Sequence, residues 1–147
     1  MQDERLRASL GNALVRLFRL VNRVHNRALA DHGVSAEQAH ILSVLWLIGP
    51  MTMGALQRHV ALSSGTLTGA IDRMEAQGMV RRVPSPDDRR AFVLEPKTTG
   101  RARQRIEDAL DETEVRIWGG LTAAERKELV RLMNKSIAFL EPDAAAR

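Results

Sequence analysis

One stretch of the chain, residues 62–96, limits the possible folds more than any other. It begins with Ser63, a good N-cap residue, and continues with apolar residues spaced as on one face of a helix. That face consists of Leu67, Ala70, Ile71 and Met74. Gly78 stands where a helix commonly ends. Two short strands are then predicted at 79–83 and 91–95, joined by the turn-forming sequence Pro-Ser-Pro-Asp-Asp. Helix, strand, charged turn and strand are the outline of a winged helix.

The opposite face of this predicted helix carries two glycines, Gly65 and Gly69. A glycine inside a helix costs about 1 kcal/mol relative to alanine, so this face suits a helix whose backbone must approach another molecule closely. The neighbouring hydroxyl and methyl groups could contact DNA base edges. A marginal surface helix is the alternative interpretation. The residues of this helix predicted to bind DNA are Ser63, Ser64, Gly65, Thr66, Thr68, Gly69 and Arg73.

Arg73 lies on the flank of the same predicted helix, where it could reach a phosphate or a base at the groove edge. The alternative is an ion pair within the chain, with an acid such as Asp72 or Glu75 as the partner.

Four arginines surround the predicted turn between the strands: Arg81, Arg82, Arg89 and Arg90. On a protruding hairpin they suit phosphate contact and insertion into a narrow minor groove. A solvated, charged hairpin is the alternative. Asp88 stands two residues before Arg90, a spacing at which its carboxylate could orient the Arg90 side chain. We therefore assign Asp88, Arg89 and Arg90 to the DNA-binding set.

The first helix is predicted to run without interruption from residue 3 to residue 30, with apolar residues three and four apart. Its length would be about 42 Å. A compact chain of this size is only about 38 Å across. Part of the apolar stripe is therefore expected to meet a second copy of the protein.

Four further helices are predicted around the winged segment. A capping box at Ser35 and Gln38 begins a helix that is apolar on nearly all sides from Ile41 to Ile48, which predicts a buried central helix. A short helix at 53–60 completes a helix-turn-helix with the one after Ser63. Two helices follow residue 100, and the second begins with a capping box at Thr122. We expect a single domain, 1–147, in which 36–96 form the DNA-binding module and 1–34 with 97–141 form a helical dimerisation region. The predicted fold class is mainly α with a small β-hairpin wing.

Composition excludes several classes of protein. The chain has no cysteine among its 147 residues, which excludes disulfides and cysteine-ligated zinc. Its net charge of +4 favours a polyanionic partner only weakly. It contains no signal peptide and no apolar run of membrane-spanning length, so we expect a cytoplasmic protein without a membrane partner. Motifs of hydrolases, P-loop enzymes and dinucleotide-binding enzymes are absent, so no enzyme activity, cofactor or metal is predicted.

A ligand cavity between the first two helices is a further hypothesis. His25 on the first helix and His40 on the second could approach each other, and Trp46 could line the same pocket. Ordinary structural or exposed histidines and a packed tryptophan are the favoured alternative.

The segment from residue 62 to residue 94 resembles the MarR family of bacterial transcription regulators. The resemblance rests on residues 63–68, 72–75, 78–82 and 88–91, and the order of the predicted helices matches the family along almost the whole chain. It implies a triangular homodimer joined by its terminal helices, with the recognition helix in the major groove and Arg90 in the minor groove. It also implies regulation by small aromatic or anionic effectors. The missing cysteine excludes the peroxide-sensing members, and Pro96-Lys97 replaces the usual Leu-Thr.

We therefore expect a sequence-specific DNA-binding regulator, a ligand-responsive repressor acting as a homodimer on a palindromic or pseudo-palindromic operator. The alternative is a winged-helix protein-interaction module that does not recognise DNA sequence.

Overall fold

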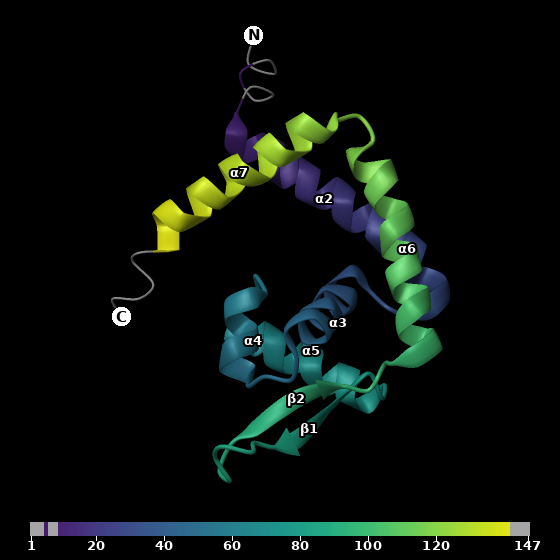
Figure 1. Ribbon diagram of the computed structural model, residues 1–147, viewed down its shortest axis with the longest axis vertical. Helices are drawn as coiled ribbons and strands as arrows, with labels where there is room; N and C mark the ends of the chain where they lie inside the picture. The colour runs from purple at the N-terminus through teal and green to yellow at the C-terminus, as the bar shows by residue number, and fades with distance from the viewer. Residues whose placement is uncertain (1–4, 6–8, 142–147) are drawn as a thin grey trace. The chain divides into compact units, whose positions relative to one another are not determined.

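The computed structural model describes residue 5 and residues 9–141 (Figure 1). Its elements are α2 (Leu10–Leu29), the 3-10 turn η1 (Ala30–His32), α3 (Ala36–Ile48), α4 (Met53–His59), α5 (Ser64–Ala76), β1 (Val80–Pro84), β2 (Phe92–Pro96), α6 (Gly100–Trp118) and α7 (Ala123–Leu140). The chain forms two compact units, Met1–Asp111 and Glu112–Arg147. The predicted fold class, mainly helical with a small hairpin wing, is confirmed.

The first described helix is shorter than predicted. The backbone at Ser9 is extended (φ −73°, ψ 122°), and its hydroxyl accepts a hydrogen bond from the backbone N–H of Asn12 at 3.4 Å, so α2 begins at Leu10. The prediction of one uninterrupted helix over 3–30 is therefore wrong. Apart from Arg5, the predicted helix before Ser9 lies outside the described residues. At 20 residues α2 is about 30 Å long, so the argument from excess length no longer holds.

The helix α3 forms the centre of the first unit. Its capping box is present as predicted, with Gln38 N–H donating to Ser35 Oγ (3.1 Å) and Ser35 N–H donating to Gln38 Oε1 (3.0 Å). Its buried residues are Ala39, Ile41, Leu42, Val44 and Leu45. The last turn differs from the prediction, because Leu47 and Ile48 are 82% and 59% exposed. The buried part of α3 therefore ends near Leu45.

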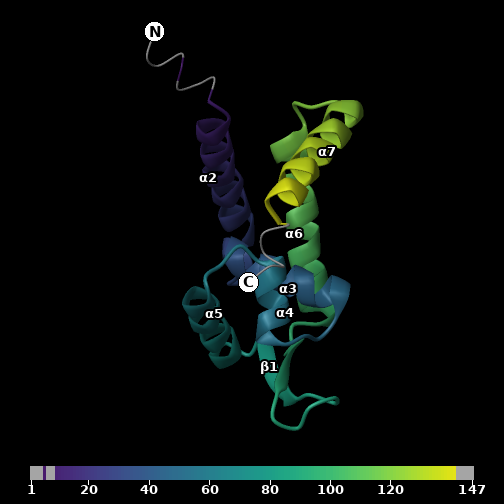
Figure 2. The same ribbon diagram turned by 90° about the vertical axis from the view of Figure 1, so that its left-hand side faces the viewer.

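The two helices of the helix-turn-helix begin at the predicted N-caps, Thr52 and Ser63. The apolar face predicted for α5 is fully buried, at no more than 1% exposure for each of Leu67, Ala70, Ile71 and Met74. Gly78, with φ +71°, ends the helical segment in the left-handed conformation that glycine adopts without strain. The helix α5 contacts both α4 and β1 (Figure 2).

The wing is an antiparallel pair of strands in which Val80 lies opposite Pro96 and Pro84 lies opposite Phe92. Each strand begins one residue later than predicted. Leu94 also exchanges two backbone hydrogen bonds with Met51, at 2.8 and 3.3 Å, which attaches the wing to the α3–α4 loop.

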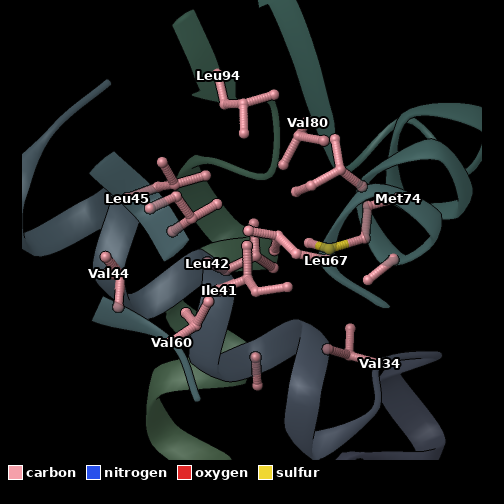
Figure 3. Close-up of a cluster of buried hydrophobic side chains, with 14 of the residues drawn as sticks. Val34, Ile41, Leu42, Val44, Leu45, Val60, Leu67, Met74, Val80 and Leu94 are labelled. Carbon is pink, nitrogen blue, oxygen red and sulfur yellow. The ribbon is translucent and has the colours of Figure 1, made fainter. Parts of the chain in front are cut away.

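A cluster of buried hydrophobic side chains packs these elements together. Side chains from α3, α5 and both strands meet in it, including Leu42, Leu45, Leu67, Val80 and Leu94 (Figure 3). The start of β1 and the middle of β2 therefore pack against α5 and α3, whereas the tip of the hairpin extends outward (Figure 1).

The second unit contains the end of α6 and the whole of α7. Thr122 and Glu125 form the predicted capping box at the start of α7. No residue of α7 is buried within the single chain. The large apolar residues that it exposes are Val130, Leu132, Met133, Ile137, Phe139 and Leu140. No described helix is both long enough and apolar enough to span a membrane.

Candidate nucleic-acid interface

The start of α5 is stabilised by its own hydroxyl groups. Ser63 Oγ accepts the backbone N–H of Thr66 at 3.3 Å and lies 2.7 Å from Thr66 Oγ1. The Thr68 hydroxyl donates to the Ser64 carbonyl at 2.9 Å. Ser63 and Thr66 therefore serve the helix cap, while Thr68 keeps its oxygen lone pairs and its methyl group for a partner.

Both glycines of α5 lie on its outer side and are not required by packing within the chain. A Cβ atom added at Gly65 would have no neighbour within 4 Å. A Cβ atom at Gly69 would lie 3.4 Å from the Arg73 Nη1 atom, which is the end of a flexible side chain. The protein could therefore hold alanine at either position. This agrees with the interpretation that the glycines serve an external contact.

Arg73 forms an ion pair within the chain, but its partner is neither Asp72 nor Glu75. Its nearest carboxylate partner is Glu37 in the first turn of α3, with 3.9 Å between Arg73 Nη2 and Glu37 Oε1. The Arg73 side chain is 64% exposed. An exposed pair at this distance stabilises by less than about 1 kcal/mol, so the guanidinium remains available to another anion.

The acidic residues Asp72 and Glu75 are instead bound by Arg82 of β1. Arg82 Nη2 lies 2.6 Å from Asp72 Oδ1, and Arg82 Nη1 donates to Glu75 Oε2. The hydrogen bond with Asp72 raises the pKa of the Arg82 guanidinium above its usual range, and the charge of Glu75 acts in the same direction. The Arg82 guanidinium also lies 5.5 Å from the centre of the Phe92 ring.

Arg81 and Arg82 are close in sequence to Arg89 and Arg90, but in the structure these two pairs of arginines have different surroundings. Arg81 pairs across the strands with Glu95, with 2.8 Å between Arg81 Nη2 and Glu95 Oε2. Arg89 and Arg90 are exposed and form no ion pair with the residues that the structure describes. The free positive charge of the wing therefore lies at its tip.

Asp88 holds the wing tip differently from the prediction. Its Oδ1 atom accepts the backbone N–H of Arg90 at 2.9 Å, and its carbonyl accepts the N–H of Ala91 at 3.0 Å. Ser85 N–H donates to the Ala91 carbonyl at 3.0 Å and closes the loop. The carboxylate thus fixes the backbone at Arg90, and no hydrogen bond or ion pair joins it to the Arg90 guanidinium in the described part of the chain.

The three residues predicted for a ligand cavity lie in different surroundings. His40 is exposed and His25 is half-buried. The Trp46 indole N–H donates to the Thr98 carbonyl at 3.0 Å, and the Arg103 guanidinium lies 5.1 Å from the centre of its ring. Trp46 therefore joins α3 to the start of α6.

A separate open groove of about 560 Å³ runs along the surface of α2. Its lining residues are Phe18, Arg19, Asn22, Arg23, Asn26, Arg27 and Ala30, none of which the sequence indicated. The sequence does contain an indication of an anion-binding surface here, because α2 has arginines on one side and no acidic residue. Among the described residues no cluster of histidine and acidic side chains could hold a metal ion.

A model of the MarR family matches residues 34–92, which include α3, the helix-turn-helix and most of the wing. The HTH-type transcriptional regulator YcgE of Bacillus subtilis is 28% identical over 150 residues, covering 97% of this chain and 96% of its own. Residues 34–92 therefore form a domain of the MarR family. Members of this family are transcriptional regulators, and the predicted functional class is therefore confirmed.

Solved structures of MarR-family proteins share the fold. BpsR of Bordetella bronchiseptica superimposes with a TM-score of 0.78 at 24% identity, covering 88% of this chain and 93% of that one. A mutant of E. coli MarR complexed with operator DNA superimposes with a TM-score of 0.75 at 24% identity, covering 86% and 92%. At this level of identity the two structures establish the fold alone.

Proposed function

We propose that the protein binds double-stranded DNA in a sequence-specific manner, with α5 in the major groove and the wing tip in the minor groove. The observation that carries this proposal is the exposed, glycine-bearing face of α5 on the same structural unit as the two unpaired arginines of the wing, Arg89 and Arg90. The E. coli MarR relative has been crystallised with operator DNA, which supports the same role here.

The proposed contacts divide between base reading and backbone binding. Ser64, Thr68 and the backbone near Gly65 and Gly69 are suited to base edges, because small side chains allow close approach. Arg73, at the flank of α5, reaches a phosphate or a base at the groove edge. Arg89 and Arg90 bind phosphates and the minor groove, Asp88 holds the loop that presents them, and Ser63 and Thr66 hold the start of α5.

The protein acts as a homodimer in this proposal. Leu10, Leu14, Val15, Phe18 and Leu20 of α2 are each more than half exposed in the single chain, and α7 exposes its apolar residues as well. Apolar surface of this extent favours a protein interface. The dimerisation region would comprise 1–34 and 97–141, with 36–96 as the DNA-binding module. Two copies related by a twofold axis would bind a palindromic or pseudo-palindromic operator in the cytoplasm.

Binding of a small aromatic or anionic effector completes the proposal. In the relative BpsR, 6-hydroxynicotinic acid regulates DNA binding. Here the arginines and asparagines of the α2 groove offer donors to a carboxylate, and Phe18 offers a ring surface. The sequence-predicted set, His25, His40 and Trp46, is the second candidate site. An effector that releases DNA would make the protein a ligand-responsive repressor.

The test is selection of bound duplexes from a random DNA pool, followed by measurement of Kd over a range of salt concentrations. The proposal predicts enrichment of a palindromic motif, with log Kd linear in log salt. Absence of any enriched sequence would instead support a winged-helix protein-interaction module. Adding aromatic carboxylates to the resulting complex, with Arg23→Gln and His40→Gln variants beside the wild type, tests the two candidate effector sites separately.

A further inference from the structure

We propose that Arg82 is a positioning residue that fixes the wing relative to α5 and so sets the spacing between two parts of the operator. These parts are the base pairs read by α5 and the minor-groove segment entered by the wing tip. The inference rests on the proposed function, and it assigns to Arg82 a role other than contact with DNA.

The first support is the number of partners that Arg82 holds at once. Its guanidinium binds the carboxylates of Asp72 and Glu75, which lie three residues apart on α5. Its backbone N–H donates to Glu75 Oε1 at 3.2 Å, and the Phe92 ring of β2 lies beside the guanidinium. One side chain therefore connects the proposed recognition helix to both strands of the wing.

The second support is the position of Arg82 along the hairpin. The start of the wing is fixed by the buried residues Val80 and Leu94, and Leu94 lies opposite Arg82 in the register. Beyond this pair the strands leave the apolar core. Within the described part of the chain, the only side-chain hydrogen bonds between α5 and the wing strands are those of Arg82 and its two acids. Loss of Arg82 would leave the outer hairpin free to change its angle relative to α5.

The third support is that Arg82 is poorly placed to bind DNA itself. Its side chain is only 25% exposed, whereas that of Arg81 is 60% exposed. To reach a phosphate it would have to leave two carboxylates, one of them on the outer side of α5. Charge-assisted bonds of this kind are among the stronger ones in proteins, and leaving them would place two uncompensated negative charges beside the DNA.

The experiment uses the operator obtained by selection and derivatives with one base pair inserted or deleted between the α5 site and the wing site of each half. Each step moves the wing site by about 3.4 Å and roughly 35°. For the wild-type protein we expect each step to weaken binding by about tenfold, because one set of contacts is lost. For Arg82→Gln we expect weaker binding to the original operator and a spacing penalty of less than about threefold.

Two variants separate positioning from charge. Arg81→Gln removes the same charge from the neighbouring strand residue, but its partner Glu95 lies within the wing, so the spacing penalty should stay at the wild-type value. The double variant Asp72→Ala, Glu75→Ala keeps Arg82 and removes both of its acceptors, so the penalty should fall as in Arg82→Gln. Thermal unfolding of each variant checks that it is folded, and the double variant serves as the readout if Arg82→Gln does not fold.

The outcomes distinguish this inference from the function on which it rests. A reduced spacing penalty in Arg82→Gln and in the double variant, with none in Arg81→Gln, supports it. Equal weakening at every spacing in those two variants would overturn the positioning role while leaving DNA binding intact. If selection with the wild-type protein enriches no sequence, the proposed function itself fails and this inference fails with it.

Discussion

Replacement of Gly69 by alanine should change the stability of α5 and its binding to DNA in opposite directions. Gly69 lies in the middle of α5, where alanine is favoured over glycine by about 1 kcal/mol. The new Cβ atom would meet only Arg73 Nη1, at 3.4 Å, which is ordinary van der Waals contact with a mobile group. We therefore expect the unfolding midpoint to rise by about 2–4 °C, the size expected for 1 kcal/mol in a chain of this length.

The same substitution should weaken binding to the operator. If the α5 backbone approaches the bases closely, the methyl group occupies space that the DNA needs. Overpacking of a close interface by one carbon costs about 1–3 kcal/mol, which corresponds to a roughly 5- to 150-fold increase in Kd. A protein that becomes more stable and binds less well cannot be explained by damage to the fold.

The assay is fluorescence anisotropy with the selected operator, combined with thermal unfolding at one fixed protein concentration, because the midpoint of a dimer depends on concentration. Gly65→Ala and Gly54→Ala form a matched pair, since each glycine is the second residue of its helix and has open space at Cβ. Gly65→Ala should weaken binding, and Gly54→Ala should not. Higher stability with unchanged affinity in Gly69→Ala would refute the close-approach argument.

Four other results are expected. Arg90→Ala should cost about 1–3 kcal/mol of operator affinity and reduce the slope of log Kd against log salt by about one for each wing arginine that contacts phosphate, of which the proposed dimer loses two. Asp88→Ala should show a smaller defect of the same sign, because the backbone N–H of Arg90 loses its acceptor; tighter binding would contradict this. Leu14→Glu places a charge on the proposed dimer surface and should dissociate or unfold the protein, and a stable wild-type monomer at micromolar concentration in light scattering would argue against the dimer. Hydrogen bonds from the backbone N–H and the hydroxyl of Thr122 lower the pKa of Glu125, so the capping box should stabilise α7 fully above the usual glutamate range and lose this effect as pH falls through the lowered value; a carboxyl NMR titration with an ordinary midpoint would exclude it.

Features that depend on neighbours in the chain could be predicted from the sequence. The N-caps at Ser35, Thr52, Ser63 and Thr122 each involve a residue three positions later, so the sequence contains both partners. The buried face of α5 follows from the helical period alone. Most of the candidate DNA-binding surface is identified for the same reason, since it is the side of α5 opposite that face.

Features that depend on a choice between partners could not be predicted in the same way. The sequence groups Arg82 with the phosphate-binding arginines, because its acidic partners, Asp72 and Glu75, are brought to it only by the turn at Gly78. At Asp88 the two-residue spacing fits a backbone N–H as well as a guanidinium. The backbone bond forms because asparagine and aspartate side chains commonly bond their own main chain two residues on.

The apolar stripes of the terminal helices differ from the sequence-based expectation in a third way, because residues predicted to be buried are exposed in the single chain. Leu132, Met133 and Ile137 have the spacing of a buried helix face, yet they are 46%, 41% and 48% exposed in the single chain. Leu14 of α2 is 58% exposed. The helical spacing of apolar residues indicates that a face is buried, but it does not indicate whether the residues that bury it belong to the same chain. Since the length argument for α2 fails at the Ser9 cap, this exposed apolar surface becomes the physical basis for expecting a second copy. The mutational test at Leu14 therefore examines the reason for the dimer as well as its existence.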